Sequence, residues 1–260
     1  MNYLVLIKMV PDTVEEIELL PNGQGIDSSL TRYKLSDPDE HAIEQALILK
    51  EKHGGNITLL SLVAPEVDDV LFTAIAKGVD RAIKINIDQT NLTTTSVASV
   101  FALYIKQSNL LSDPATLILT GSQASDDLDG ELAPIIAENL SLPVLTVVSG
   151  VTLNQNLTQL VVFKEFSGGL RGEFELSLPC VLGLQSAESP PRYVPVSKVR
   201  NVMKSSKIEN VELPDFQPSQ MFQIEKLYKP EISTHAEMLE GNLEEVADKI
   251  ASILSQKGII

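Results

Sequence analysis

Four acidic residues follow a glycine in one short stretch of the chain, "TGSQASDDLDGEL". An apolar run ends at Gly121, small residues follow, and a helical pattern begins near Asp129. A turn of this kind is typical of phosphate sites, in which main-chain N–H groups and the dipole of the next helix face the anion. The carboxylates would repel a phosphate, so backbone donors would have to bind it. The alternative is that the acids cap the helix N-terminus, because the dipole favours negative charge there.

The same loop gives less support to a metal site. Asp127, Asp129 and Gly130 match part of a calcium loop, but the glycine comes two places early and no bidentate glutamate follows at the right distance. The histidines lie far apart in the sequence and lack ligand spacing: His41, His53 and His235. We therefore expect no metal.

Catalytic patterns are also missing from the sequence. It contains neither a Walker lysine loop nor a G-x-G-x-x-G after any strand-like run, and no G-x-S-x-G elbow. Cys180 lies in the apolar run "LPCVLGL", where a cysteine is usually a small, inert hydrophobic residue. The sequence therefore predicts a protein that is not an enzyme with its own active site.

The loops would be positioned by apolar strands that alternate with amphipathic helices. Strand-like runs occupy residues 3–10, 56–63, 81–87, 115–120 and 143–148. Helical spacing of apolar residues covers residues 39–53, 67–77, 94–107 and 131–140. This pattern predicts an α/β, Rossmann-like parallel sheet with helices on both faces. The strand-ending segments "KMVPDT", "SLVAPE" and "TGSQASDD" would then share the edge at which ligands bind.

The pattern changes after Ser149. Two strand-like runs flank Gly168 and Gly169 and predict a hairpin excursion near residues 151–178. Residues 188–230 are rich in Pro, Ser and Lys and show little periodicity, and a final helix is predicted over residues 243–254. We therefore divide the chain into an α/β domain, residues 1–187, and a C-terminal arm, residues 188–260, that packs on something outside the first core.

Charge and composition narrow the classes of partner and compartment. The formal net charge of the 260 residues is −15 and is spread along the chain, which argues against a nucleic-acid partner. One cysteine fits a reducing compartment, and no stretch approaches the length of a membrane span. We expect a cytoplasmic protein without an integral membrane segment. Residues 192–207 carry five basic residues and no acid, so this segment could contact an acidic partner or a cofactor phosphate, or be a solvated loop.

Several stretches together resemble one family. They are "VLIKMVPDT", "SDPDEHAIEQALILKEKHGG", "AIAKGVDRAIKI", "LILTGSQASDDLDGELAPIIAENLSLP", "LPCVLGL" and "PPRYVPVSKVRNVMKSSKIE". Their order and spacing, over nearly the whole chain, resemble the beta (small) subunit of electron transfer flavoproteins, including the nitrogen-fixation-associated and electron-bifurcating branches.

The resemblance implies partners and cofactors. Family members pair with a larger alpha subunit whose mobile domain carries a redox-active FAD, and the C-terminal arm of the beta subunit wraps this partner. The beta subunit itself holds AMP in ordinary members and a second, bifurcating FAD in the other branch. Carried over by motif, this nucleotide pocket would use Leu6, Ser36, Asp37, Pro38, Asp39, Leu62, Gly121, Ser122, Gln123, Ala124, Ser125, Asp126, Asp127, Leu128, Asp129, Gly130, Glu131 and Leu132.

The resemblance also implies two contact surfaces. Thr13 and Pro38 fall where the family's beta subunit approaches the alpha-bound flavin. The segment from 185 to 193 matches the loop that docks onto dehydrogenases, with these candidate residues: Gln185, Glu188, Pro190, Arg192 and Tyr193.

The chain departs from the family pattern at three places. Ser36 and Asp37 stand where the family has Asn-Pro. The acidic loop usually continues with Gln, then Thr or Val, then Gly, and here continues with Glu131, Leu132 and Ala133. The docking loop normally presents a leucine, and Glu188 stands there instead.

The sequence thus predicts the beta subunit of a heterodimeric electron transfer flavoprotein, binding AMP or FAD and docking a flavin dehydrogenase and an electron acceptor. The electron-bifurcating type is the leading alternative. A free-standing adenine-nucleotide-binding module without redox work is a second, although it leaves the C-terminal extension unexplained. A subunit that has lost nucleotide binding and only scaffolds is a third, motivated by Glu131 and Ala133.

Overall fold

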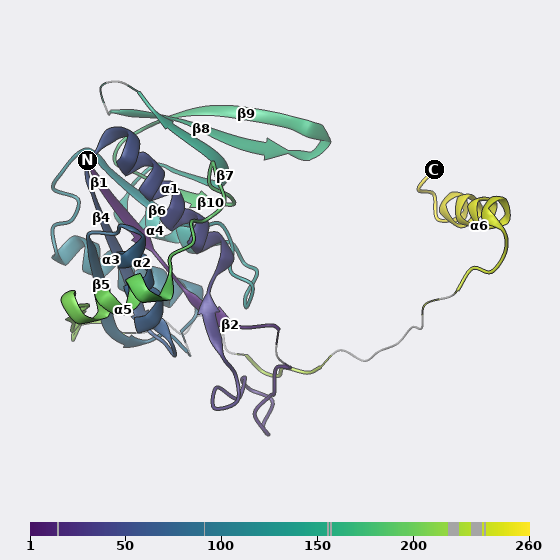
Figure 1. Cartoon of the computed structure of the whole chain (residues 1–260), viewed down its shortest axis with the longest axis horizontal. Helices are drawn as coiled ribbons and strands as arrows, with labels where there is room; N and C mark the ends of the chain where they lie inside the picture. The colour runs from purple at the N-terminus through teal and green to yellow at the C-terminus, as the bar shows by residue number, and fades with distance from the viewer. Residues whose placement is uncertain are drawn as a thin grey trace.

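A computed structural model describes residues 1–14, 16–90, 92–154, 156, 158–217, 224–229, 236 and 238–260. Within these residues, a sheet of nine strands has the order β11-β5-β4-β1-β6-β10-β7-β8-β9 (Figure 1). The strands from β11 to β7 run parallel, whereas β8 and β9 continue the sheet antiparallel. The strand bounds are β1 Asn2–Leu6, β4 Asn56–Val63, β5 Arg81–Asp88, β6 Thr116–Gly121, β7 Val144–Leu153, β8 Gln159–Phe166, β9 Leu170–Ser177, β10 Cys180–Leu184 and β11 Glu209–Val211.

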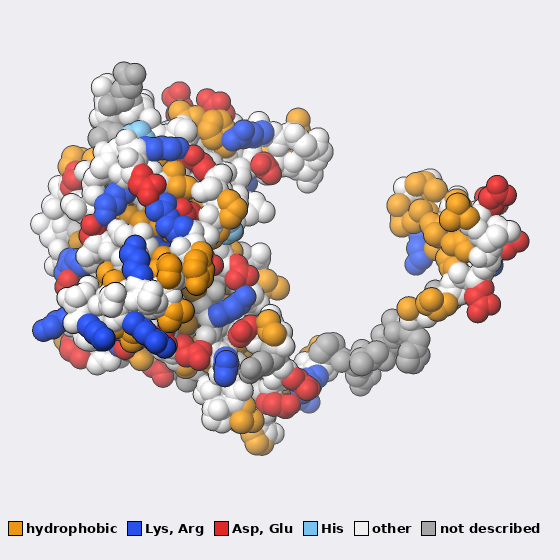
Figure 2. Space-filling view, viewed as in Figure 1, with side chains coloured by type: hydrophobic (Ala, Val, Ile, Leu, Met, Phe, Trp, Pro, Cys, Tyr) orange, Lys and Arg blue, Asp and Glu red, His pale blue; other side chains and the backbone are white. Residues whose placement is uncertain are grey.

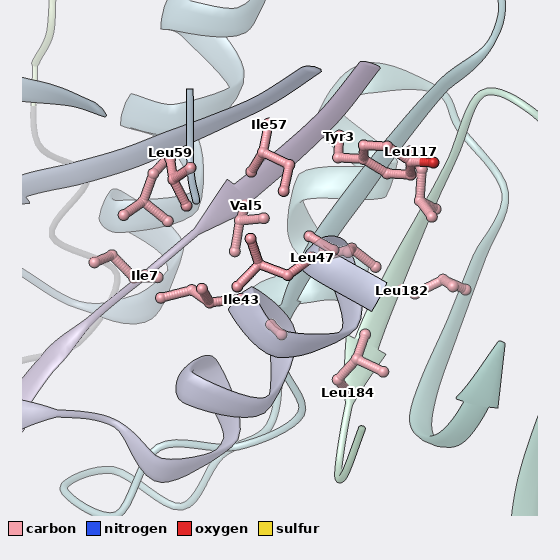
Figure 3. Close-up of a cluster of buried hydrophobic side chains, with 14 of the residues drawn as sticks. Tyr3, Val5, Ile7, Ile43, Leu47, Ile57, Leu59, Leu117, Leu182 and Leu184 are labelled. Atoms are coloured by element: carbon pink, nitrogen blue, oxygen red, sulfur yellow. The ribbon is translucent and has the colours of Figure 1, made fainter. Parts of the chain in front are cut away.

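Helices cover both faces of this sheet, so the predicted fold class is confirmed. Along β1 the side chains alternate: Tyr3 and Val5 pack against one hydrophobic cluster, and Leu4 and Leu6 against the other. The first cluster includes residues of α1 and α2, as Figure 3 shows for α1, and the second includes residues of α3 and α4. The helix bounds are α1 Asp37–His53, α2 Val67–Lys77, α3 Thr94–Gln107 and α4 Leu132–Leu140, which lie within two residues of the predicted ranges.

The first strand is shorter than predicted. The apolar run over residues 3–10 divides, because the chain leaves the main sheet after Leu6. It continues as β2, Met9–Pro11, which pairs antiparallel with β3, Tyr33–Leu35, in a separate two-stranded sheet. Buried Gln89 fixes this departure, because its amide accepts from Met9 N–H at 3.3 Å and donates to Met9 O at 2.7 Å.

The predicted hairpin is present as β8 and β9, and β7 runs five residues beyond the predicted strand, to Leu153. The stretch after residue 188 contains two elements that were not predicted. Helix α5, Val196–Ser205, packs against α2, and β11 adds an edge strand beside β5. The final helix, α6, Leu243–Gln256, is confirmed and has no buried residue. In Figure 1 it lies apart from the sheet.

Candidate functional site

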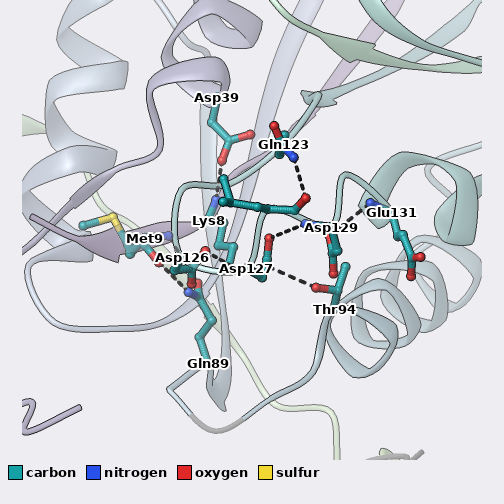
Figure 4. Close-up of polar contacts among 11 residues, drawn as sticks. Lys8, Met9, Asp39, Gln89, Thr94, Gln123, Asp126, Asp127, Asp129 and Glu131 are labelled. Atoms are coloured by element: carbon teal, nitrogen blue, oxygen red, sulfur yellow. Dashed lines mark hydrogen bonds and ion pairs between the residues drawn. The ribbon is translucent and has the colours of Figure 1, made fainter. Parts of the chain in front are cut away.

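A pocket lies at the carboxyl edge of the sheet, where the chain leaves β1 and β6. It gathers most of the predicted nucleotide segments, because parallel strands deliver their following loops to one edge. The 121–132 loop forms one wall, the start of α1 another, and the start of α3 a third (Figure 4). The lining residues are Lys8, Ser36, Asp39, Thr94, Val97, Gly121, Ser122, Gln123, Ala124, Asp127, Asp129, Gly130 and Leu132.

Asp39 joins the walls of this pocket. Its side chain is buried at the first turn of α1, and its Oδ2 accepts from Lys8 N–H at 2.8 Å. Its Oδ1 accepts from Gly121 N–H at 2.6 Å. Burial raises the pKa of the Asp39 carboxyl to about 7, against the lowering effect of the two N–H donors. Asp39 therefore links the start of α1 by hydrogen bonds to the chain after β1 and to the end of β6.

Lys8 holds the acidic loop against the end of β1. Its ammonium donates to Asp126 Oδ1 at 2.8 Å and also to Asp127 Oδ2. The Thr94 hydroxyl, at the start of α3, donates to the same Asp127 oxygen at 3.1 Å. Burial opposes the charge on Lys8, but the two carboxylates outweigh it and raise the pKa of Lys8. The loop is thus closed over the pocket by ion pairs.

Other acids of the loop bind its own backbone. Asp127 Oδ1 accepts from Asp129 N–H at 3.3 Å, and Asp129 Oδ1 accepts from Glu131 N–H at 3.1 Å, one residue before α4 begins. These are turns within the loop, and α4 itself has no side-chain cap hydrogen bond, so the capping alternative stays a prediction. Asp126 and Asp127 form ion pairs with Lys8, and Asp127 does so in addition to its backbone contact.

Several predicted residues lie outside the pocket wall. Leu6 and Leu62 are fully buried in the cluster beneath α3 and α4. Asp37 pairs with Lys34 at 3.0 Å. Pro38 lies beside Gly121. Four more predicted residues are exposed: Ser125, Leu128, Glu131 and Thr13.

Three lining residues were not predicted: Lys8, Thr94 and Val97. For Lys8 the sequence did carry a signal, because it is the basic residue of the strand-ending segment "KMVPDT". Thr94 and Val97 belong to α3, and helical periodicity does not say which helix start reaches a loop that comes later in the chain.

Gly121 permits the close approach of β6 to α1. A Cβ there would lie 2.7 Å from Asp39 Oδ1 and 2.8 Å from Pro38 Cβ. Gly121→Ala should therefore lower the free energy of unfolding by about 1–3 kcal/mol in a urea titration. Gly150→Ala is the control, because its Cβ would meet nothing closer than the Phe163 ring at 3.4 Å. Equal losses for the two variants would contradict the argument.

A second surface is formed where residues 185–193 cross α1. Arg192 N–H donates to Glu44 Oε2 at 2.9 Å, and its guanidinium donates to Glu44 Oε1 at 2.8 Å and to Glu51 Oε1 at 2.5 Å. The hydrogen bonds that its guanidinium donates to these carboxylates raise the pKa of Arg192. Ala187 N–H donates to His41 Nδ1 at 3.2 Å. The segment is therefore fixed on α1 by side chains of that helix.

Glu188 belongs to this fixed set. Its N–H donates to Gln45 Oε1 at 3.1 Å, and its carboxylate pairs with Lys52 at 2.6 Å. Gln185 N–H donates to Val148 O at 2.8 Å. Pro190 is exposed, and Tyr193 is 82% exposed. Tyr193 is therefore the large side chain that this segment presents to solvent.

Comparison with known proteins shows the family to which the chain belongs. The sequence model of the electron transfer flavoprotein domain matches residues 26–216, most of the chain. The electron transfer flavoprotein subunit beta of Bacillus subtilis is 31% identical over 98% of this chain and 97% of its own. The chain belongs to the electron transfer flavoprotein beta-subunit family.

Two further relatives carry other names. Protein FixA of Sinorhizobium fredii is 30% identical over 70% of this chain and 64% of its own. The caffeyl-CoA reductase-Etf complex subunit CarD of Acetobacterium woodii is 26% identical over the full length of both chains. The family resemblance inferred from the sequence is therefore confirmed.

The departures from the family pattern can now be placed. Ala133, at the usual glycine position, is buried on α4 next to Gly183 of β10 and does not line the pocket. Glu131 is exposed outside the lining. Neither of these two residues lines the pocket, whereas Leu132, the departure between them, does.

Neither metal binding nor cysteine chemistry is supported. Among the described residues, no three His, Cys, Asp or Glu side chains gather in a way that could hold a metal ion; His235 lies outside them. Cys180 is buried in β10, and burial raises the pKa of its thiol to about 12, so the nucleophilic thiolate is disfavoured. None of the described helices is long and apolar enough to cross a membrane.

Proposed function

We propose that this chain is the beta subunit of a heterodimeric electron transfer flavoprotein, that it binds one adenine nucleotide in the Lys8–Gly121 pocket, and that it docks a flavin dehydrogenase and an electron acceptor in the cytoplasm. The observation that supports nucleotide binding best is the pocket itself. It lies at the carboxyl edge of a parallel sheet, behind a loop of small residues that precedes a helix. The redox chemistry belongs to the flavin, and the protein binds and orients it.

The donor set of the pocket suits an adenosine phosphate. Ser36, Ser122 and Thr94 offer hydroxyl groups, Gln123 offers an amide, and Lys8 offers a cation. The cavity itself measures about 20 Å³, enough for little more than one water molecule. The 121–131 loop must therefore move away from Lys8 to admit AMP or the adenosine end of FAD.

Partner contacts are proposed for two further surfaces. Exposed apolar side chains of the β8–β9 hairpin, Phe166, Leu170 and Phe174, and those of α6, Leu243, Ile250 and Ile253, suit the alpha subunit. Figure 2 shows the hydrophobic side chains of α6 gathered on one side of the helix. Large apolar surface on a helix that buries nothing in its own chain marks an interaction site.

The docking segment 185–193 presents exposed Tyr193, although Glu188 stands at the position of the leucine usual in the family. Tyrosine is enriched where protein interfaces concentrate their binding energy. Figure 2 also shows Lys and Arg side chains over α5, next to this segment, which would steer an acidic partner. Glu188 is turned towards Lys52, so it does not replace the usual anchor.

Assembly tests this proposal. The chain should be co-expressed with an electron transfer flavoprotein alpha subunit from the same organism and passed through size exclusion. We expect an equimolar complex that carries flavin absorbance, which a flavin dehydrogenase reduces in the presence of its substrate. A stable monomer that forms no complex would contradict the proposal, and such a monomer with bound adenine nucleotide would favour the free-standing module.

A further inference from the structure

We propose that the Lys8 ammonium recognises the phosphate of the bound nucleotide, and that Asp126 and Asp127 are built-in competitors that hold Lys8 until a phosphate displaces them. The inference rests on the proposed nucleotide function and adds the group that selects for phosphate. It also makes loop opening and phosphate binding a single exchange of ion-pair partners.

The charges of the pocket wall support this exchange. Lys8 is the basic residue among the described lining residues, whereas Asp39, Asp127 and Asp129 also line the pocket. A phosphate placed beside the closed loop would meet more negative than positive charge. Since like charges in a partly buried site repel strongly, a phosphate can bind only if the loop carboxylates leave Lys8.

The backbone of Lys8 is fixed independently of the acidic loop. Its backbone N–H is held by buried Asp39, and its side chain is only 13% exposed. The backbone of Lys8 is thus anchored at the end of β1 by α1, separately from the ion pairs that its ammonium makes with the loop. The two loop carboxylates are more accessible, at 25% and 26%. The acidic loop is therefore the part that can leave, while the cation stays in place.

The exchange would also free other donors. The Asp127 carboxylate accepts hydrogen bonds from both the Thr94 hydroxyl and the Lys8 ammonium. The Gln123 side chain donates to Leu128 O within the closed loop. When the loop opens, Lys8, Thr94 and Gln123 become available together, and all three are donors suited to phosphate oxygens.

Binding measurements on the alpha–beta complex test the inference. AMP, FAD and adenosine are titrated calorimetrically into complex dialysed free of loosely bound nucleotide. Lys8→Met should weaken binding of the phosphate-bearing ligand roughly 10- to 100-fold, as expected for losing a charge-assisted hydrogen bond, and leave adenosine binding unchanged. The double variant Asp126→Asn with Asp127→Asn should tighten AMP binding roughly tenfold, because the competitor is neutral.

The chain offers a matched control in another ion pair. Lys84 and Asp68 pair at 2.6 Å, and neither lines the pocket. Lys84→Met changes the net charge by the same amount as Lys8→Met, and Asp68→Asn removes one of the two negative charges that the double variant removes. Both control variants should leave AMP binding unchanged.

The outcomes separate this inference from the function on which it rests. If neither AMP, FAD nor adenosine binds the wild type, the nucleotide function is wrong and the inference with it. Suppose that AMP or FAD binds the wild type, and that Lys8→Met weakens this binding no more than it weakens adenosine binding. Lys8 is then structural, and the inference alone is wrong. Should Lys8→Met fail to fold, the double variant still decides, since unchanged or weaker AMP binding would overturn the competition.

Discussion

Raising the pH should lower the free energy of unfolding by about 1.4 kcal/mol for each pH unit, over the range in which Asp39 holds a proton in the folded chain but not in the unfolded chain. The carboxyl has a pKa of about 7 in the folded chain, because burial penalises its charged form, against an ordinary value of 3.8. Between these values the folded state holds a proton that the unfolded state has lost. Raising the pH therefore removes stability until the folded carboxyl ionises, and below 3.8 both states are protonated and the contribution is constant.

The measurement is urea denaturation at several pH values for the wild type and Asp39→Asn. An amide cannot ionise, so the difference between the two proteins should shrink or reverse as the pH rises from 5 to 7. Asp80→Asn is the control, because Asp80 also accepts a backbone N–H, at 2.7 Å, but is 38% exposed. A constant difference between wild type and Asp39→Asn at every pH would show that Asp39 is ionised in the folded chain.

Arg192→Ala should lower the free energy of unfolding by about 3 kcal/mol. The Glu44 side chain is 3% exposed and would keep a buried charge without its cation. The docking segment would also lose the guanidinium that holds it to α1, so the amides of residues 187–189 and 192 should exchange hydrogen faster. Urea denaturation and hydrogen exchange measure these two effects.

Arg81→Ala is a close control for this prediction. Arg81 bonds both oxygens of Glu209 at 2.6 Å, but the two side chains are 43% and 45% exposed. Exposed pairs of this kind contribute about 0–1 kcal/mol. If Arg81→Ala and Arg192→Ala cost the same, burial of Glu44 is not what makes the Arg192 pair important.

The sequence predicted the repeating elements better than the breaks between them. Helix α1 could be predicted because its apolar residues recur at helical spacing and Gly54 and Gly55 follow it. The division of the first strand could not, because Ile7 and Met9 are as apolar as the residues before them. The chain turns there owing to Gln89, some 80 residues away in sequence, and long-range contacts of this kind leave no local pattern.

The same distinction holds for the pocket. Its place at the sheet edge followed from the order of strands and loops, and the family motifs gave the loop and the 36–39 turn. The pairing of Lys8 with Asp126 and Asp127 joins residues nearly 120 positions apart, and the acids alone predicted only repulsion or capping. Likewise, the family pattern placed Glu188 at the position of the docking leucine. Only its ion pair with Lys52 shows that the Glu188 side chain contacts α1 of its own chain.

The central claim, that this chain holds a nucleotide inside an electron-transfer heterodimer, is tested most directly by counting bound nucleotides. The alpha–beta complex should be purified, denatured, and its released nucleotides separated and quantified against protein. We predict one nucleotide in the beta subunit besides the FAD of the alpha subunit: AMP if the complex is of the ordinary type, a second FAD if it is electron-bifurcating. One FAD per complex and no second nucleotide, with no AMP or FAD binding on titration, would contradict the account.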